Sequence, residues 1–170
     1  MGMIDKTILV TGGNSGIGKC VVNTLLEMGA KVFAVDLNID QLIVLKEKFT
    51  DKIECVKYDL TDLNSISKIF CRAKSEKFIF DGMVHCAGVS LLMKIEDNDI
   101  EKMLLTYKVN VLSFIELLKY FHNPEFSNDL ASVVTMTSIA TTVASYRQAL
   151  YSSSKAALEQ VVRCAAKEFL

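Results

Sequence analysis

The sequence has little of what marks disordered, secreted or membrane-spanning chains. It holds one proline in 170 residues beside 51% hydrophobic residues, which argues for one compact domain over residues 1–170. No apolar stretch approaches the roughly 18 residues of a membrane span. The start of the chain, MGMIDK before a run of only three apolar residues, gives no signal peptide. We therefore expect a soluble, cytoplasmic protein.

An excess of charge and a metal-binding cysteine pattern are also missing. Nineteen basic and twenty acidic residues give a net charge of −1 without a basic block, so we expect no nucleic-acid or anionic-membrane partner. The expected partner is a small molecule. The cysteines are odd in number, scattered and without C-x-x-C spacing, which favours core thiols in a reducing compartment and no metal site. They are Cys20, Cys55, Cys71, Cys86 and Cys164.

The most informative stretch is residues 7–28, TILVTGGNSGIGKCVVNTLLEM. A short apolar run gives way to glycines at positions 12, 13, 16 and 18 and then to apolar residues at helical spacing, which predicts a strand, a tight turn and a helix. Glycines let the backbone adopt positive φ and approach a ligand, and the N–H groups that begin a helix attract phosphate. The spacing G-x-x-x-G-x-G differs from the common dinucleotide fingerprint. For this turn alone, a βα connection without a ligand remains the alternative.

The rest of the chain repeats this alternation of strand and helix. Gly29 is placed to end the first helix, and Asn38 to cap a helix over residues 39–49. We expect further strands at 31–36, from 53 to near 59, 80–88 and 131–138, and further helices beginning at Thr61 or Asp62, over 99–121 and from 149 to the end. This pattern predicts a doubly wound parallel sheet with helices on both faces, whose ligand site lies at the carboxyl ends of the strands.

Two carboxylates end predicted strands on the cofactor side of this sheet. Asp36 can accept both hydroxyls of an adenosine ribose, which favours NAD, because a 2′-phosphate would meet like charge. Neither Ser15 nor Leu37 supplies a compensating cation. A solvated carboxylate before a helix is the alternative for Asp36. Asp59 is placed to accept a hydrogen bond from the adenine amino group, or is a turn residue.

A second group of residues suggests proton transfer. Tyr151 and Lys155 lie one helical turn apart and share a face, and a neighbouring ammonium favours the phenolate of a tyrosine. An exposed, unrelated pair is the alternative for these two residues alone. Ser138, at the predicted end of the fifth strand, can bring its hydroxyl to the same substrate oxygen. Asn110 is flanked by valines in the middle of a helix, where it has either a special role or bonds to the backbone at a kink.

Together, TGGNSGIG at 11–18, DL at 59–60, CAG at 86–88, Asn110, Ser138 and YSSSK at 151–155 resemble the ordered motifs of the short-chain dehydrogenase/reductase family. The resemblance implies a Rossmann fold with strand order 3-2-1-4-5 and hydride transfer between NAD(H) and a secondary alcohol or ketone. It implies that Tyr151 exchanges the hydroxyl proton, Ser138 holds the oxygen, Lys155 binds the nicotinamide ribose and Asn110 anchors a relaying water. The implied cofactor-binding residues are Gly12, Asn14, Ser15, Gly16, Ile17, Gly18, Asp36, Leu37, Asp59, Leu60, Ala87, Gly88, Tyr151 and Lys155.

The chain also departs from this family in two ways. His85 and Cys86 replace two asparagines that precede the Ala-Gly pair, and we interpret His85 as structural. Family members continue into further strands and a lid over the substrate, so we expect a truncated chain that binds the adenosine half of NAD and turns over slowly.

Two questions stay open at the level of the sequence. A dinucleotide-binding regulatory or scaffold module without catalysis is one alternative function, and a Rossmann-like methyltransferase is another. The apolar faces of helices 99–121 and 149–170 either bury within the monomer or, as the resemblance implies, form a homodimer or homotetramer.

Overall fold

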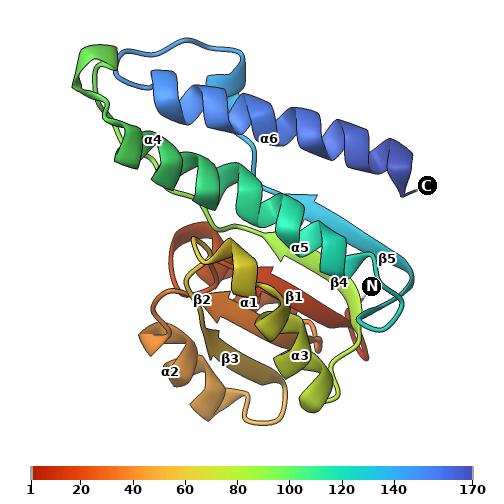
Figure 1. Ribbon diagram of the computed structural model, residues 1–170. Helices are drawn as coiled ribbons and strands as arrows, with labels where there is room; N and C mark the ends of the chain where they lie inside the picture. The colour runs from red at the N-terminus through yellow and green to blue at the C-terminus, as the bar shows by residue number, and fades with distance from the viewer. Residues whose placement is uncertain (1, 170) are drawn as a thin grey trace.

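The computed structural model describes residues 2–169 and contains a parallel five-stranded sheet between two layers of helices (Figure 1). The strand order is β3-β2-β1-β4-β5, which confirms the predicted order. The strands are β1 (Thr7–Thr11), β2 (Lys31–Asp36), β3 (Ile53–Lys57), β4 (Phe80–His85) and β5 (Ser127–Thr135). The order reverses at β1, between β2 and β4, so the carboxyl end of β1 is where a ligand is expected.

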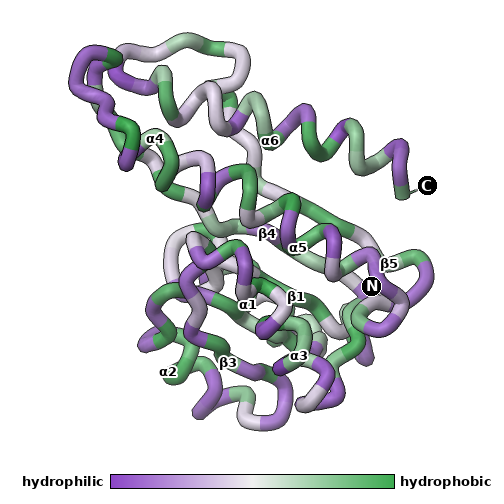
Figure 2. The backbone as a smooth tube through the Cα atoms, in the orientation of Figure 1, coloured by the Kyte–Doolittle hydropathy of each residue, from purple (hydrophilic) through white to green (hydrophobic). Residues whose placement is uncertain are grey.

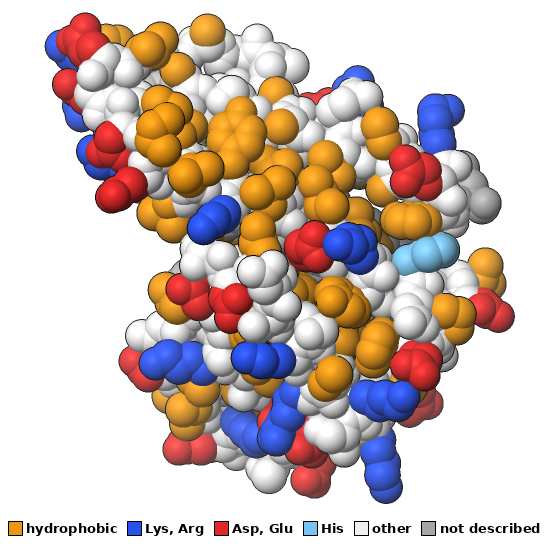
Figure 3. All heavy atoms as spheres, viewed as in Figure 1, with side chains coloured by type: hydrophobic (Ala, Val, Ile, Leu, Met, Phe, Trp, Pro, Cys, Tyr) orange, Lys and Arg blue, Asp and Glu red, His pale blue; other side chains and the backbone are white. Residues whose placement is uncertain are grey.

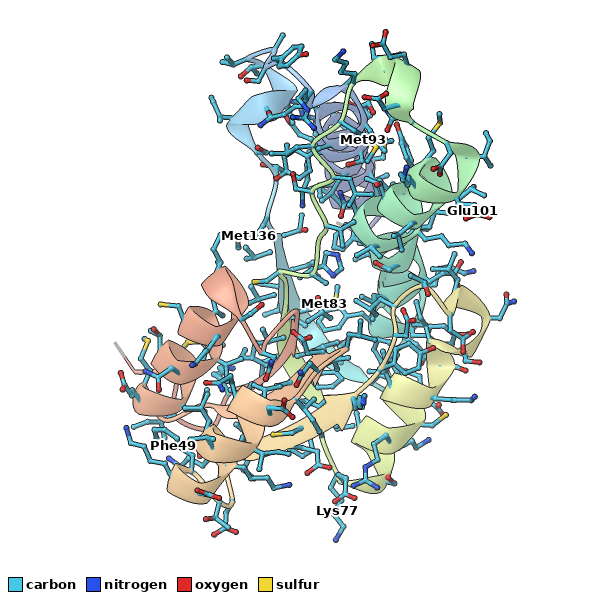
Figure 4. All side chains as sticks on the ribbon, turned by 90° about the vertical axis from the view of Figure 1, so that its left-hand side faces the viewer. Phe49, Lys77, Met83, Met93, Glu101 and Met136 are labelled. Atoms are coloured by element: carbon cyan, nitrogen blue, oxygen red, sulfur yellow. The ribbon has the colours of Figure 1, made fainter. Side chains whose placement is uncertain are left out.

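The helices cover both faces of this sheet. They are α1 (Gly16–Glu27), α2 (Asp40–Lys48), α3 (Ser67–Ser75), α4 (Ile100–Tyr107), α5 (Ser113–Phe121) and α6 (Ala149–Glu168), with short turns of helix η1 (Leu63–Ser65), η2 (Ile95–Asp97), η3 (Lys108–Leu112) and η4 (Ile139–Thr141). Figure 4 shows the sheet edge-on, with α1 and α2 on one side and α3, α4 and α5 on the other. Within residues 2–169, no helix combines the length and apolar character needed to cross a membrane.

The alternation of side chains along the strands fills two separate cores. On β1, Ile8 and Val10 belong to the core beneath α1 and α2, whereas Leu9 belongs to the core beneath α3 and α5. Both faces of a parallel strand are therefore apolar, as expected when helices cover each side. The helices are apolar on one face only, and in Figure 2 the tube of α6 alternates between hydrophobic and hydrophilic stretches.

Two predicted strand boundaries are wrong. β4 ends at His85 instead of Gly88, because its ladder with β1 stops at the pair Thr11 and His85. β5 spans Ser127–Thr135 instead of 131–138. It too stops where the neighbouring strand stops, since its ladder with β4 ends at the pair His85 and Thr135. The first residues of β5 are polar, so the sequence pattern did not predict a strand there. The register in this part is irregular, and Leu130 adopts a positive φ of 68°.

Helix boundaries also differ from the prediction. Residues 99–121 form three segments, since a π-helical turn, η3, separates α4 from α5 and contains Asn110. Helix α2 begins at Asp40 with Ile39 at the N-cap position, so the predicted cap Asn38 lies one residue before the cap, where its Oδ1 accepts from the Asp40 N–H at 2.8 Å. Helix α3 begins only at Ser67, after η1. Gly29 does follow the end of α1 with a φ of 93°, as predicted.

Candidate functional site

The turn after β1 needs glycine at two positions because backbone packs against it. A Cβ added to Gly12, whose φ is 68°, would lie 2.6 Å from the Ala87 nitrogen. A Cβ added to Gly18 would lie 2.0 Å from the Gly12 oxygen. The start of α1 therefore sits directly on the turn, and the turn sits on the segment that follows β4.

The amino end of α1 is open toward a ligand. Ser15 occupies the N-cap position in an extended conformation, and its hydroxyl makes no capping hydrogen bond. The first turn of α1 carries no acidic residue, so nothing there opposes an anion. These features give the helix terminus the character of a phosphate site.

A cleft of about 580 Å³ lies over this turn at the carboxyl ends of the strands. It brings together these predicted residues: Gly12, Ser15, Gly16, Ile17, Gly18, Asp36, Leu37, Asp59, Leu60, Ala87 and Gly88. It is also lined by Cys86 of the CAG motif and by residues that the sequence reasoning missed, namely Tyr58, Thr61, Val89, Leu105 and Val109. Extending each motif by one residue would have found all of these except Leu105.

Backbone N–H groups fix the carboxylate of Asp36 at the rim of this cleft. Its Oδ2 accepts from the Asn14 N–H at 2.9 Å and its Oδ1 from the Asn38 N–H at 3.1 Å. Asn14 itself does not line the cleft. Its side-chain oxygen turns away to accept from the N–H groups of Gln41 and Leu42, at 2.9 and 3.2 Å.

Three predicted residues converge at the other end of the cleft. A Cβ added to Gly88 would lie 3.3 Å from Lys155 Nζ and 3.4 Å from Asn110 Oδ1. The Lys155 side chain is buried, and its Nζ donates to the Met136 carbonyl at 2.8 Å. Burial lowers the pKa of Lys155, and the nearby Cys86 opposes that shift only in part.

Asn110 is fully buried and bonded on all sides. Its Oδ1 accepts from the Val89 N–H at 2.7 Å, while its Nδ2 donates to the Val89 carbonyl and to Ser154 Oγ, both at 2.9 Å. The side chain thus satisfies backbone beside a helix irregularity, as one of the two interpretations expected. Its effect is to hold the segment after β4 against α6.

Ser138 and Tyr151 lie beside a second cavity. Because β5 ends early, Ser138 is not at its end but caps η4, with its Oγ accepting from the Ala140 N–H at 3.1 Å. Tyr151 is half-buried in the first turn of α6, which packs against η4. The adjoining cavity, of about 660 Å³, lies between residues 93–96 and 140–152 and is lined by Met93, Ala140 and Tyr146 among others, whereas Ser138 and Tyr151 are not among its lining residues. Figure 4 shows Met93 far above the sheet and Met136 just above its edge.

His85 lies inside the protein and outside both cavities. Its Nδ1 is 2.7 Å from Thr11 Oγ1, and its ring packs against Phe114 with centroids 5.2 Å apart. Burial, reinforced by the charge of Lys155, lowers the pKa of His85 to about 3. Its Nε2 has no hydrogen-bond partner within residues 2–169. A neutral histidine joining the ends of β1 and β4 fits the structural interpretation.

The sheet order and the position of the cleft define a Rossmann-like α/β protein. The sequence model of the family described as short chain dehydrogenase matches residues 6–170. The chain therefore belongs to the short-chain dehydrogenase family, whose named members are dehydrogenases and reductases, and thus to a family of oxidoreductases.

Curated relatives match nearly the whole chain. An NAD-dependent glycerol dehydrogenase of Listeria innocua is 28% identical over 97% of this chain and 65% of its own length. A 2,3-dihydro-2,3-dihydroxybenzoate dehydrogenase of Bacillus subtilis is 30% identical over 96% of this chain and 64% of its own. A probable short-chain type dehydrogenase/reductase, VdlC, of Helicobacter pylori is 28% identical over 89% and 55%. The chain thus spans about half to two thirds of the length of these relatives.

Solved structures share the fold closely. A 4-hydroxyisoleucine dehydrogenase complexed with NADH is 25% identical and superposes with a TM-score of 0.89, covering 97% of this chain and 68% of its own. A short-chain dehydrogenase/reductase from Brucella melitensis has a TM-score of 0.90 over 98% of this chain and 71% of its own. At 22% identity, the second likeness concerns the fold alone.

Proposed function

We propose that this protein binds NAD(H) in the cleft over the glycine turn and transfers hydride between it and a secondary alcohol or ketone. The observation that carries the proposal is the convergence of Lys155, Asn110 and Gly88 at one end of a cleft whose other end holds Asp36. A dinucleotide laid along the cleft spans these two ends. The amino end of α1, whose first turn carries no acidic residue and whose N-cap hydroxyl makes no capping hydrogen bond, fits its phosphates.

The choice of NAD over NADP rests on charge. Among the described residues that line the cleft there is no lysine or arginine, and the carboxylate of Asp36 is at its rim. A 2′-phosphate would meet that carboxylate without a compensating cation, whereas a ribose diol would donate to it. The NAD-dependent glycerol dehydrogenase and the NADH complex among the relatives support the same choice.

Four side chains of this chain serve the chemistry in the proposed mechanism. Tyr151 gives or takes the proton of the substrate oxygen, and Ser138 donates a hydrogen bond to that oxygen. Lys155 holds the nicotinamide ribose one helical turn from Tyr151. Asn110, whose side chain is bonded to Val89 and Ser154, holds the segment after β4 against α6 and so positions the other three. The nicotinamide, when bound, supplies or accepts the hydride at its C4 position.

For the substrate we propose a chemical class and no particular molecule. The relatives act on substrates as different as glycerol and dihydrodihydroxybenzoate, so we propose only a small alcohol or ketone in the cavity beside Tyr151. Because the chain covers only part of its relatives' length, this activity is proposed for the whole protein, with little turnover by the 170 residues alone.

We also propose a homodimer or homotetramer through α4, α5 and α6. Hydrophobic side chains gather over these helices in Figure 3, and an apolar groove of about 510 Å³ lies between α5 and α6. Buried apolar area of this kind drives association.

Calorimetric titration with NADH and with NADPH tests the proposal directly. We expect NADH to bind at least about tenfold more tightly, which corresponds to about 1.4 kcal/mol from the charge at Asp36. A screen of secondary alcohols with the full-length gene product follows. Failure to bind either dinucleotide, or tighter binding of NADPH, would contradict the proposal.

A further inference from the structure

The side chain of Asn14 joins the glycine turn to the start of α2. Its Oδ1 accepts from the N–H groups of Gln41 and Leu42 at 2.9 and 3.2 Å, and these donors belong to the first turn of α2. Since both partners are donors, the oxygen of the amide must face them. The residue therefore caps a helix that begins more than twenty positions further along the chain.

The backbone of the same residue orients Asp36. The Asn14 N–H donates to Asp36 Oδ2 at 2.9 Å, while the Asn38 N–H donates to Oδ1 at 3.1 Å. Asp36 ends β2, and α2 begins four residues later. The backbone N–H of Asn14 thus bonds to the Asp36 carboxylate, and its side chain bonds to α2. Residue 14 therefore contacts both ends of the 36–40 loop.

We propose that Asn14 is a positioning residue that sets the preference between NAD and NADP through Asp36, without contacting the dinucleotide. The inference rests on the proposed function, because it assumes that the cleft binds a dinucleotide. It assigns to the side chain of Asn14 a role distinct from direct cofactor contact, in keeping with its absence from the lining of the cleft.

The physical reason is that discrimination needs a fixed charge. A carboxylate held at the rim accepts the ribose hydroxyls and repels a 2′-phosphate, whereas a carboxylate on a loosened loop rotates away from the phosphate and loses the diol. Releasing the cap on α2 should therefore weaken NADH binding and relax the exclusion of NADPH. A residue that merely stabilised the fold would change both affinities alike.

The test measures the ratio of NADPH to NADH dissociation constants by calorimetry, well below the melting temperature of each variant. In Asn14→Ala we expect the ratio to fall about fivefold, the equivalent of losing a helix cap worth about 1 kcal/mol. Asn14→Asp keeps an oxygen acceptor in place and should retain at least the wild-type ratio. Asn14→Ser has a shorter reach and should give an intermediate ratio, and it serves as the readout if the alanine variant folds poorly.

Gln41→Ala provides the matched control. It removes the 2.8 Å bond from Lys19 Nζ to Gln41 Oε1, which also joins α1 to α2, but leaves both N–H donors to Asn14 in place. We expect an unchanged ratio. An unchanged ratio in Asn14→Ala and Asn14→Ser, or an equal fall in Gln41→Ala, would overturn the inference while leaving NAD binding by the wild type intact. A wild type that binds neither dinucleotide would instead refute the proposed function.

Discussion

The dinucleotide cleft and the cavity beside Tyr151 are built in different ways. Backbone bonds join the walls of the cleft, such as Gly12 N–H to the Val35 carbonyl at 2.9 Å and Cys86 N–H to the Thr11 carbonyl at 3.0 Å. The cavity lies between two loops joined by a bond from the Met93 N–H to the carbonyl of Arg147, which itself adopts a positive φ of 64°. The cleft is thus fixed by the sheet, whereas the cavity depends on its loops. Dinucleotide binding and turnover should therefore respond to different substitutions.

Tyr151→Phe should give the largest difference between the effect on turnover and the effect on dinucleotide binding. Loss of the acid/base group is expected to lower kcat by about 10²- to 10⁴-fold, the usual contribution of general acid–base catalysis. The NADH dissociation constant should stay within about twofold, because Tyr151 does not line the cleft. Steady-state kinetics of the full-length gene product and calorimetry measure the two quantities.

The same variant distinguishes an enzyme from a dinucleotide-binding scaffold module. A scaffold module would have no dehydrogenase activity to lose, and equal activity in Tyr151→Phe and the wild type would contradict the proposed role of the phenol.

Gly18→Ala should distort the dinucleotide cleft and leave the cavity beside Tyr151 unchanged. Its Cβ would meet the Gly12 oxygen at 2.0 Å, so backbone must move, and overpacking costs about 1–3 kcal/mol. At the upper end of that range we expect NADH binding to weaken about 100-fold.

Gly16→Ala is the matched control for this effect. No protein atom lies within 4 Å of its added Cβ, so in the protein alone only the positive φ of 49° opposes the change. We expect a loss of affinity of less than about tenfold. Equal losses in the two variants would show that the close approach of α1 to the turn does not matter for binding.

Local patterns in the sequence predicted the parallel sheet, whereas the strand order and most of the residues that line the cleft followed from the resemblance to the family. The glycine turn, the apolar strands and Asp36 need only their neighbours in the sequence to be recognised. What the sequence reasoning missed depends on contacts between distant segments. The ends of β4 and β5 are set by where a partner strand stops, and the π-helical turn at Asn110 accompanies a side chain that bonds to Val89.

Asn14 is the clearest case of this limit. Its place inside TGGNSGIG suggested cofactor contact, whereas its oxygen bonds to α2. No local pattern links residue 14 to residues 41 and 42. A cap supplied from elsewhere in the chain is invisible until the two segments are placed together.

His85 is buried between the ends of β1 and β4 and should lower stability in acid. The unfolded state takes up a proton near the ordinary pKa of about 6.5, whereas the folded state resists it down to about 3. The stability from this group is therefore full above pH 6.5 and falls as the pH drops toward 3. By linkage we expect about 2 kcal/mol less stability at pH 5 than at pH 7.5, measured by urea unfolding.

His85→Gln should flatten this dependence on pH, since it keeps a polar side chain without the titrating ring. His122→Gln is the control, because His122 is exposed at the end of α5. A His85→Gln protein as sensitive to acid as the wild type would exclude the buried ring as the cause.

Leu130→Gly should have the smallest effect and leave both regions unchanged. Leu130 is fully exposed at the amino half of β5, and its φ of 68° is unfavourable for a side chain with a Cβ. Relief of about 1–2 kcal/mol of strain is offset in part by the greater freedom of glycine in the unfolded chain, so we expect a gain of about 0.5–1 kcal/mol. Urea unfolding measures this gain, and NADH affinity should not change. A stabilised protein with altered NADH affinity would show that a change at the amino half of β5 affects the cleft. The cleft and the cavity beside Tyr151 would then not be independent of the rest of the sheet.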